Sequence, residues 1–234
     1  MPANGADFYM ALSEAAPKPL SEFRSILDFG CGRLARMFKG HPHRVEGCDI
    51  DRRHVDWIND SLDFMRAKVS SVKPPIPYAD NEFEAVISIS IFTHLNEQSQ
   101  DEFPRELCRV TTPGGRLFLT VHGERALARA VNELAIRAML DVPDDRFAAA
   151  RAAFVSGEHA VILQFGHLTT MHREKQSLLQ KLRGKVIEEP FEYGITFIPE
   201  SYIHKHWGQW FKVLDYRVGA LHDFQDIVVV EPRK

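Results

Sequence analysis

An apolar strand that runs straight into a tight glycine turn is the feature that most constrains how this 234-residue chain can fold. Residues 25–32 read SILDFGCG, and residues 46–49 read EGCD, a second strand that ends on an acid. In a βαβ unit this order places the glycine turn and the Asp49 carboxylate side by side at the carboxyl ends of two parallel strands, where open α/β sheets bind nucleotides. Glycines let the backbone approach a ligand closely, and Asp49 can accept both hydroxyl protons of a ribose.

The first half of the chain continues this alternation of strands and helices. Apolar residues at three- and four-residue spacing predict a helix over 52–68, and the apolar run 83–91 predicts a strand buried on both faces. The full expectation is strands over 24–29, 44–49, near 69, 83–91 and 116–121, with helices over 7–16, 33–39, 52–68 and 99–110. This order predicts a doubly wound, Rossmann-like α/β sheet.

The pattern changes after the fifth expected strand. Residues 124–140 and 144–154 favour helices, and the segment that follows to about residue 190 is polar and irregular and carries His159, His167 and His172. About 70 residues is too long for a simple crossover. We therefore interpret 123–192 as an inserted, largely helical lid over the acceptor site, within a single domain that spans 1–234.

The end of the chain predicts an antiparallel strand pair. A helix over 200–210 leads to strands over 211–217 and 226–231. Only about eight residues join these strands, which is too few for a helical crossover, so we expect them to pair antiparallel.

Composition excludes several classes of function. The net charge of -3 and the sequence pI of about 6.4 give no basic excess for nucleic acid or an anionic membrane. No apolar run approaches the roughly 20 residues of a membrane span, and no signal peptide is visible. Three cysteines without metal-binding spacing indicate reduced, buried thiols. We expect a cytoplasmic protein with no nucleic-acid or membrane partner.

The ordered set of motifs resembles the class I S-adenosylmethionine-dependent methyltransferases. The matching segments are ILDFGCG (26–32), GCDID (47–51), 74–95, 106–123 with its PGG turn, and the closing strands 211–217 and 225–232. The resemblance implies a seven-stranded sheet that ends in an antiparallel pair, and S-adenosyl-L-methionine as the cofactor. The segments FTHL, LTVHGE, YGITF and a closing His222 with Gln225-Asp226 are similar to a branch that accompanies bacterial glycan or secondary-metabolite pathways.

The resemblance also implies which residues bind the cofactor. Asp28, Gly30, Cys31 and Gly32 would line the methionine end, Asp49 would hold the ribose diol, Ile50 and Ser71 would lie at the adenine, and Ser88, Ile89 and Ser90 would lie beneath the cofactor. Two positions depart from the family pattern: Leu34 stands where the turn has a third glycine, and Ser70-Ser71 where an acid accepts the adenine amino proton.

Three histidines are candidates for a general base. Methyl transfer to a hydroxyl requires the removal of a proton, and histidine suits this near neutral pH. His94, His122 and His222 follow predicted strands or lie in terminal loops; a helix cap for His94 and a solvated loop for His222 are the alternatives. Tyr193 and Thr196 are candidates for substrate contact or for packing. No acid follows the fourth strand, so we predict no metal.

Three functions remain open. The one that we favour is S-adenosylmethionine-dependent methyl transfer to a small-molecule acceptor, with a hydroxyl of a sugar or secondary metabolite as the first expectation. A binding protein that keeps the fold but has lost catalysis is the alternative, because the turn is altered at Arg33-Leu34. A nicotinamide-dependent oxidoreductase is the third; it would need a crossover helix before the last strand and a Tyr-Lys or Cys-based hydride site, and neither is found.

Overall fold

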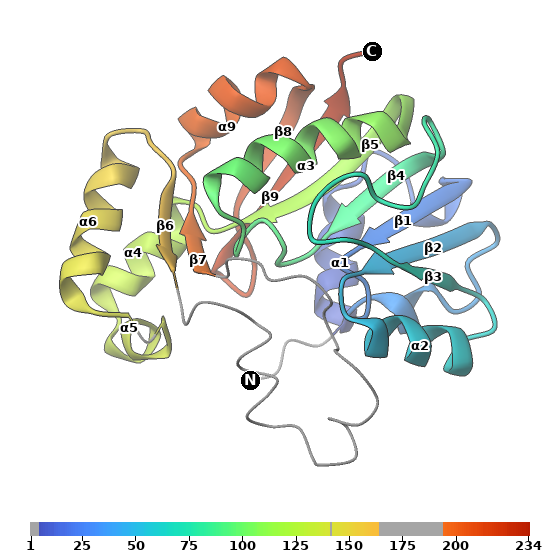
Figure 1. The fold of residues 1–234 in the computed structure, drawn as a ribbon, viewed down its shortest axis with the longest axis horizontal. Coiled ribbons are helices and arrows are strands. Elements are labelled where there is room, and N and C mark those ends of the chain that lie inside the picture. The colour runs from blue at the N-terminus through green and yellow to red at the C-terminus, as the bar shows by residue number, and fades with distance from the viewer. Residues whose placement is uncertain (1–4, 141, 164–193) are drawn as a thin grey trace.

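A seven-stranded mixed sheet forms the centre of the computed structural model, which describes residues 5–140, 142–163 and 194–234 (Figure 1). The strand order is β3 (Arg66–Val69), β2 (Arg44–Asp49), β1 (Ser25–Phe29), β4 (Phe83–Ser88), β5 (Thr111–Val121), β9 (Gln225–Pro232) and β8 (Phe211–Leu221). The first five strands along the chain are parallel to one another, and β9 lies antiparallel between β5 and β8. The predicted Rossmann-like sheet with a terminal antiparallel pair is therefore confirmed.

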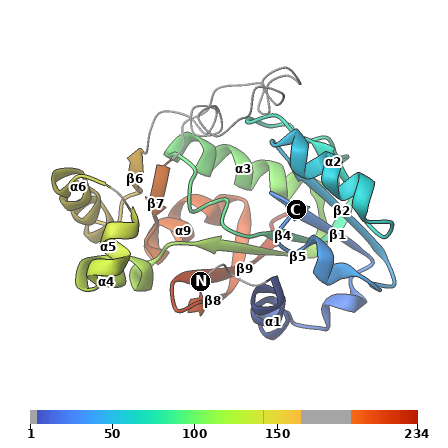
Figure 2. The ribbon, with the colours of Figure 1, turned by 90° about the horizontal axis from the view of Figure 1, so that it is seen from below.

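Helices cover both faces of this sheet, since alternate strand residues point to opposite sides. On one face α1 (Gly5–Ala15) and α2 (Arg52–Ser61) pack on residues such as Ile26. On the other face α3 (Glu97–Val110) and α9 (Glu200–His206) pack on residues such as Leu27. Figure 2 shows α1 on one side of the sheet and α3 with α9 on the other. None of the helices in the described residues is long and apolar enough to cross a membrane.

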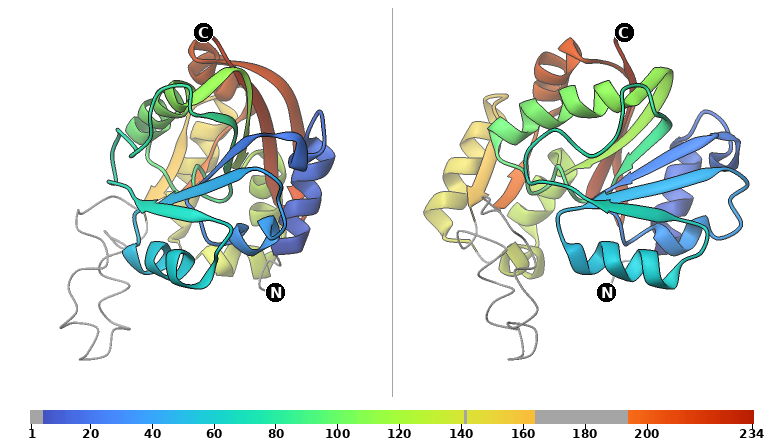
Figure 3. Two further views of the ribbon diagram at one scale, coloured as in Figure 1. Left: turned by 90° about the vertical axis from the view of Figure 1, so that its right-hand side faces the viewer. Right: turned by 45° about the vertical axis from the view of Figure 1, so that its right-hand side comes forward.

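A smaller group of elements stands beside the carboxyl edge of the sheet, and we call it the α4–β7 unit. It comprises α4 (Glu124–Asn132), α5 (Leu134–Leu140), α6 (Asp144–Val155) and the antiparallel pair β6 (Ala160–Leu163) and β7 (Gly194–Phe197). Its own apolar cluster includes Phe147 and Phe154. Figure 3 shows the unit, in yellow and orange, beside the main sheet.

Several element boundaries differ from those expected. The expected helix over 52–68 is wrong in its second half, because α2 ends at Ser61 and β3 begins at Arg66. The Asn59 side chain exchanges two hydrogen bonds, of 2.9 and 3.0 Å, with the Ala67 backbone, and these fix the chain reversal. Leu62 and Met65 remain buried without helical structure, which explains the misleading periodicity.

Other corrections concern short elements. The expected helix over 33–39 is only a 3-10 helix, η2 (Ala35–Phe38). The helix expected over 124–140 breaks at Glu133, whose backbone is extended. The segment expected to be irregular contains β6, whereas His167 and His172 lie outside the described residues. The last expected helix continues past α9 only as a 3-10 turn, η3 (Trp207–Gln209). All three cysteines are buried and free, as predicted.

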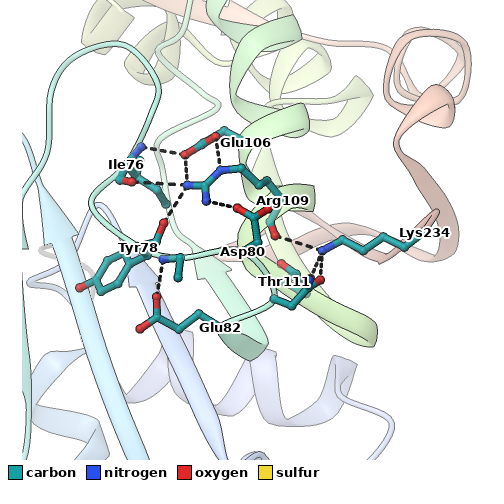
Figure 4. Close-up of polar contacts among 10 residues, drawn as sticks. Ile76, Tyr78, Asp80, Glu82, Glu106, Arg109, Thr111 and Lys234 are labelled. Atoms are coloured by element: carbon teal, nitrogen blue, oxygen red, sulfur yellow. Dashed lines mark hydrogen bonds and ion pairs between the residues drawn. The ribbon is translucent and has the colours of Figure 1, made fainter.

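A polar network at the amino edge of the sheet holds the loop between β3 and β4 (Figure 4). The Arg109 guanidinium donates to the Glu106 carboxylate at 2.6 Å, to the Asp80 carboxylate at 2.6 Å and to the Tyr78 carbonyl at 2.9 Å. Glu106 also accepts the Ile76 N–H at 2.8 Å. One arginine thereby fixes both the loop and the end of α3.

The same network reaches the end of the chain. The Lys234 ammonium donates to the carbonyl oxygens of Arg109, at 3.0 Å, and of Thr111, and to the Asn81 side chain. Lys234, two residues after β9, is thus bound to the segment before β4 and to the start of β5.

Candidate cofactor and acceptor site

The glycine turn after β1 has the backbone geometry that its sequence requires. Gly30 and Gly32 have φ values of +79° and +136°, which side-chain-bearing residues rarely adopt. A Cβ atom on Gly30 would lie 2.2 Å from the Ile91 side chain, whereas a Cβ on Gly32 would meet nothing within 4 Å. The N–H groups of Gly30 and Cys31 donate to the Cys48 carbonyl, which ties the turn to β2. The turn is closed by Ile91 on one side and open at Gly32.

Asp28 lies behind this turn as a buried carboxylate. It accepts a hydrogen bond from the Gly32 backbone, and its Oδ2 atom has no hydrogen-bond partner in the described part of the chain. Burial raises the pKa of Asp28 to about 7, the Gly32 hydrogen bond partly opposes this, and the nearby Asp49 carboxylate adds to it. An unpaired buried carboxylate oxygen is costly, and it suits a cationic ligand group such as an α-ammonium.

Asp49 stands at the carboxyl end of β2, as the sequence predicted. Its Oδ1 atom accepts the Asp51 N–H at 2.7 Å, and its Oδ2 atom lies 3.6 Å from the Nδ1 atom of His54, whose pKa it raises. The Asp49 carbonyl accepts the Ser70 N–H at 2.9 Å, which brings the expected adenine side next to it. Ile50 is half-buried and Ser71 is exposed. His54 was missed, because only the strand-to-helix geometry brings it to Asp49.

The end of β4 supplies polar groups beside the turn. Ser88 is fully buried, and its Oγ atom has no partner among the described residues, while the Ile89 side chain belongs to the apolar core. Ser90 has φ of +59°, a strained conformation that is found disproportionately at functional sites. Its Oγ atom lies 2.9 Å from the Gln225 amide nitrogen and accepts from Arg33 at 3.3 Å. Ser90 thus links the turn after β1 to the start of β9.

His94 and His122 form a pair at the ends of β4 and β5. Their ring centroids are 6.4 Å apart and nearly perpendicular. The His94 Nδ1 atom lies 2.8 Å from the Gly194 carbonyl and must donate to it. The Thr196 backbone partly opposes the lowering of the His122 pKa. The His122 Nδ1 atom has no partner within the described chain.

Burial keeps both rings neutral at pH 7. It lowers the pKa of His94 to about 4, with a smaller contribution from the Arg33 charge. It lowers the pKa of His122 to about 3, and the neighbouring His94 contributes. His122 is 5% exposed and packs on Phe224, whereas His94 is half-buried. His94 is therefore the more exposed ring of the pair.

Strand β7 holds this pair in place by lying between the two loops that carry it. The Thr196 N–H donates to the Thr93 carbonyl at 2.9 Å, and its hydroxyl donates to the Leu95 carbonyl at 2.6 Å. The Ile198 N–H donates to the His122 carbonyl at 2.9 Å. Thr196 is fully buried, and the candidate Tyr193 lies outside the described residues. The FTHL, VHG and GITF segments are thereby brought together.

The closing loop contributes differently from what its sequence indicated. His222 lies at the β8–β9 turn, where its exposed ring packs on Phe8 of α1 and its Nε2 atom is 4.0 Å from the Asp7 carboxylate. Asp226 is buried and accepts the Tyr216 hydroxyl and the Gly219 N–H, both at 2.7 Å. Of the three candidate bases, the structure joins His94 and His122 and places His222 against α1.

Comparison with known proteins extends these observations. Residues 27–119 match a family described as a methyltransferase domain. Methyltransferase GfsG of Streptomyces halstedii is 28% identical over 108 residues, 43% of this chain and 38% of that protein. Ajmaline N-methyltransferase of Rauvolfia serpentina is 27% identical over 137 residues, 55% of this chain and 46% of that protein. The chain spans less than half the length of these two relatives.

A solved structure shares the fold over nearly the whole chain. The PH0226 protein of Pyrococcus horikoshii OT3 superposes with a TM-score of 0.63 at 14% identity, and the match covers 97% of this chain and 91% of that one. The strand order, the glycine turn followed by Asp49, and the family match together define a Rossmann-like methyltransferase domain. Residues 27–119 thus match a methyltransferase domain, and the fold resembles that of the class I S-adenosylmethionine-dependent methyltransferases, so S-adenosylmethionine is the cofactor to compare with the site.

The residues of the turn fit this cofactor. The unpaired oxygen of Asp28 suits its α-ammonium, the open face of Gly32 admits its chain, and the half-buried Asp49 can accept hydrogen bonds from its ribose. The antiparallel β9 leaves no place for the crossover helix that a nicotinamide-dependent oxidoreductase would need before its last strand.

Proposed function

We propose that this protein transfers a methyl group from S-adenosylmethionine to a hydroxyl oxygen of a small-molecule acceptor, with His94 as the general base. The observation that carries the proposal is the pair of neutral imidazoles at the carboxyl edge of the sheet. Because the Gly194 carbonyl holds the hydrogen on Nδ1 of His94, the basic lone pair lies on Nε2. A fixed tautomer supplies a base without reorientation during the reaction.

The chain's residues have two tasks in this chemistry. When bound, the cofactor supplies an electrophilic methyl on a sulfonium, which becomes a thioether as the methyl leaves. The protein aligns the acceptor oxygen in line with that bond, and His94 Nε2 takes the hydroxyl proton as the new C–O bond forms. His122 and β7 hold the His94 ring in its orientation.

The position of the α4–β7 unit supports an acceptor site next to the His94–His122 pair. Its strand β7 contacts the loops that carry both histidines. We propose that the described part of the expected insertion, 124–163, forms one wall of the acceptor site. Thr196 supports that wall through its hydrogen bond to Leu95.

Two alternatives share the cofactor site but predict different chemistry. Ajmaline N-methyltransferase is named for transfer to nitrogen, and a neutral amine needs little help from a base. A binding protein that has lost catalysis would keep cofactor affinity without turnover. The altered turn at Leu34 is the observation that favours this second alternative.

The test begins with calorimetric titration with S-adenosylhomocysteine, which needs no knowledge of the acceptor. Micromolar affinity, about -8 kcal/mol, is expected. A panel of sugars, phenols and amines is then screened with radiolabelled S-adenosylmethionine. Transfer to hydroxyl acceptors supports the proposal, transfer to amines alone overturns the oxygen assignment, and binding without turnover across the panel favours the binding protein.

A further inference from the structure

The chain departs from the common α/β layout directly after its glycine turn. In most nucleotide sites of this kind, the N-terminus of a full α-helix follows the turn, and its free N–H groups and partial positive charge bind an anionic group. Here β1 and β2 are joined by η2, a 3-10 helix of 4 residues. Leu34 is fully buried in the core beneath it. The backbone therefore supplies little positive charge at this position.

Two arginines stand where that charge is missing. Arg33 and Arg36 line a cavity of about 330 Å³ together with Gly32, the residue whose Cβ position is open. Arg33 donates to the Ser90 hydroxyl at 3.3 Å, and the Arg36 guanidinium lies 4.7 Å from the centre of the Trp57 ring. In the described part of the chain, neither guanidinium has a carboxylate within ion-pair distance. Both are held in place and keep donors for a ligand.

The start of α1 closes the cavity and packs against the backbone of Arg33. A Cβ atom on Gly5 would lie 2.7 Å from the Arg33 carbonyl oxygen, so the helix packs directly on the turn. Gly5 and Met37 complete the cavity lining. This close packing places Arg33 by its backbone as well as by its hydrogen bond to Ser90.

The groups around Gly32 are complementary to a zwitterion. Its N–H binds Asp28, whose second oxygen lacks a partner, and its open side adjoins the two guanidinium groups. An α-amino acid carries an ammonium and a carboxylate on one carbon, and guanidinium binds carboxylate with paired hydrogen bonds. We infer that Arg33 and Arg36 bind the α-carboxylate of the cofactor's methionine moiety in place of a helix N-terminus. This inference rests on the proposed function.

Calorimetry with two ligands tests this assignment. S-adenosylhomocysteine carries the amino-acid group, whereas 5′-methylthioadenosine lacks it. We expect Arg33→Gln and Arg36→Gln each to weaken S-adenosylhomocysteine binding about 10-fold and the double variant about 100-fold, as for charge-assisted hydrogen bonds. Binding of 5′-methylthioadenosine should stay within about twofold of the unmodified protein in all three variants.

Matched controls separate a carboxylate contact from a change of shape. Arg105→Gln removes an exposed arginine from α3 and should leave both affinities unchanged. The double lysine variant, Arg33→Lys with Arg36→Lys, keeps the charge but loses the paired geometry, and should fall between the unmodified protein and the double Gln variant. Thermal unfolding of each variant checks that the fold is retained.

The outcomes are distinct. Unchanged S-adenosylhomocysteine affinity in the double Gln variant overturns the inference, and so does an equal loss for both ligands. If the unmodified protein binds neither ligand, the proposed function fails and the inference with it. Selective loss of S-adenosylhomocysteine supports the inference, whether or not an acceptor has been found.

Discussion

The two edges of the central sheet treat a buried carboxylate in opposite ways. At the amino edge, the carboxylate of Glu106, which is 6% exposed, meets the Arg109 guanidinium and the Ile76 N–H, and each of these groups has a partner. At the carboxyl edge, polar atoms of four buried residues have no partner within the described chain: Asp28, Ser88, Thr93 and His122. An unsatisfied buried polar group costs about 1–3 kcal/mol.

This difference indicates what each edge is for. The amino edge uses charge to hold a loop, a helix end and the chain terminus together. The carboxyl edge contains buried polar atoms without a hydrogen-bond partner, and a bound ligand could supply these partners. Such atoms are expected at a ligand-binding site. Substitutions at the amino edge should therefore change stability, and substitutions at the carboxyl edge should change binding and turnover.

The largest effect is expected on turnover from a carboxyl-edge residue. His94→Ala should lower kcat about 10²- to 10⁴-fold if the ring removes the acceptor proton. Affinity for S-adenosylhomocysteine should hardly change. Single-turnover kinetics with an acceptor from the screen would measure the rate of methyl transfer. Calorimetry would measure the affinity for S-adenosylhomocysteine. His204→Ala, which alters an exposed histidine on α9, is the control; full activity of His94→Ala would remove it as the base.

The pH profile sharpens this expectation. Since the pKa of His94 is lowered to about 4, its ring stays neutral and basic above that value. A hydroxyl acceptor should therefore give a flat rate between pH 6 and 8 and a loss only as the pH falls toward 4. A rate limb near the ordinary histidine value of about 6.5 would contradict the enclosed pair as the base.

The next largest effect concerns the amino edge. Arg109→Ala leaves the Glu106 carboxylate buried without its cation, and should lower the free energy of unfolding by about 3 kcal/mol. Urea denaturation would measure the loss, with Arg151→Ala as the exposed control. The folded Arg109→Ala variant should bind S-adenosylhomocysteine with the same affinity as the unmodified protein. A loss of affinity with unchanged stability would reverse the assignment of the two edges.

Asp49 tests the cofactor side of the carboxyl edge. Asp49→Ala removes the proposed ribose acceptor and should weaken S-adenosylhomocysteine binding by about 30- to 100-fold, or about 2–3 kcal/mol. The neighbouring Asp51 is the matched control, because it caps α2 by accepting the Arg53 N–H. Asp51→Ala should lower stability by about 1 kcal/mol and leave affinity nearly unchanged. Unchanged affinity in Asp49→Ala would overturn the ribose assignment.

Local patterns were enough to predict the framework. The SILDFGCG turn, Asp49 and the short connection of the last two strands predicted the sheet and its antiparallel end. These features depend on neighbours in sequence: apolar strands, glycines with positive φ, and a loop too short for a helix. For the same reason the carboxyl-edge location of Asp28, Asp49 and His94 followed from strand order alone.

Features set by distant contacts could not be predicted in this way. The pairing of His94 with His122 depends on β7, about 100 residues further along the chain, which hydrogen-bonds to both loops. The end of α2 depends on Asn59 meeting the Ala67 backbone. The Arg109 network joins three segments, and nothing in its local sequence distinguishes Arg109 from the exposed arginines of neighbouring helices.

The smallest expected effect is a pH-dependent stability difference at Asp28. The pKa of Asp28 is raised from 3.8 to about 7 by burial, so the folded state holds a proton that the unfolded state has released. The stability that this proton supplies is full below pH 3.8 and is lost as the pH rises through about 7. Relative to Asp28→Asn, the free energy of unfolding of the unmodified protein should fall by about 1 kcal/mol between pH 6 and 7.

Urea denaturation of both proteins, without and then with S-adenosylhomocysteine, would measure this difference. Because the ligand's ammonium would compensate the carboxylate charge, the difference should shrink when the ligand is bound. A pH-independent difference would mean that Asp28 is ionised without a partner, and a difference that the ligand leaves unchanged would separate Asp28 from the cofactor.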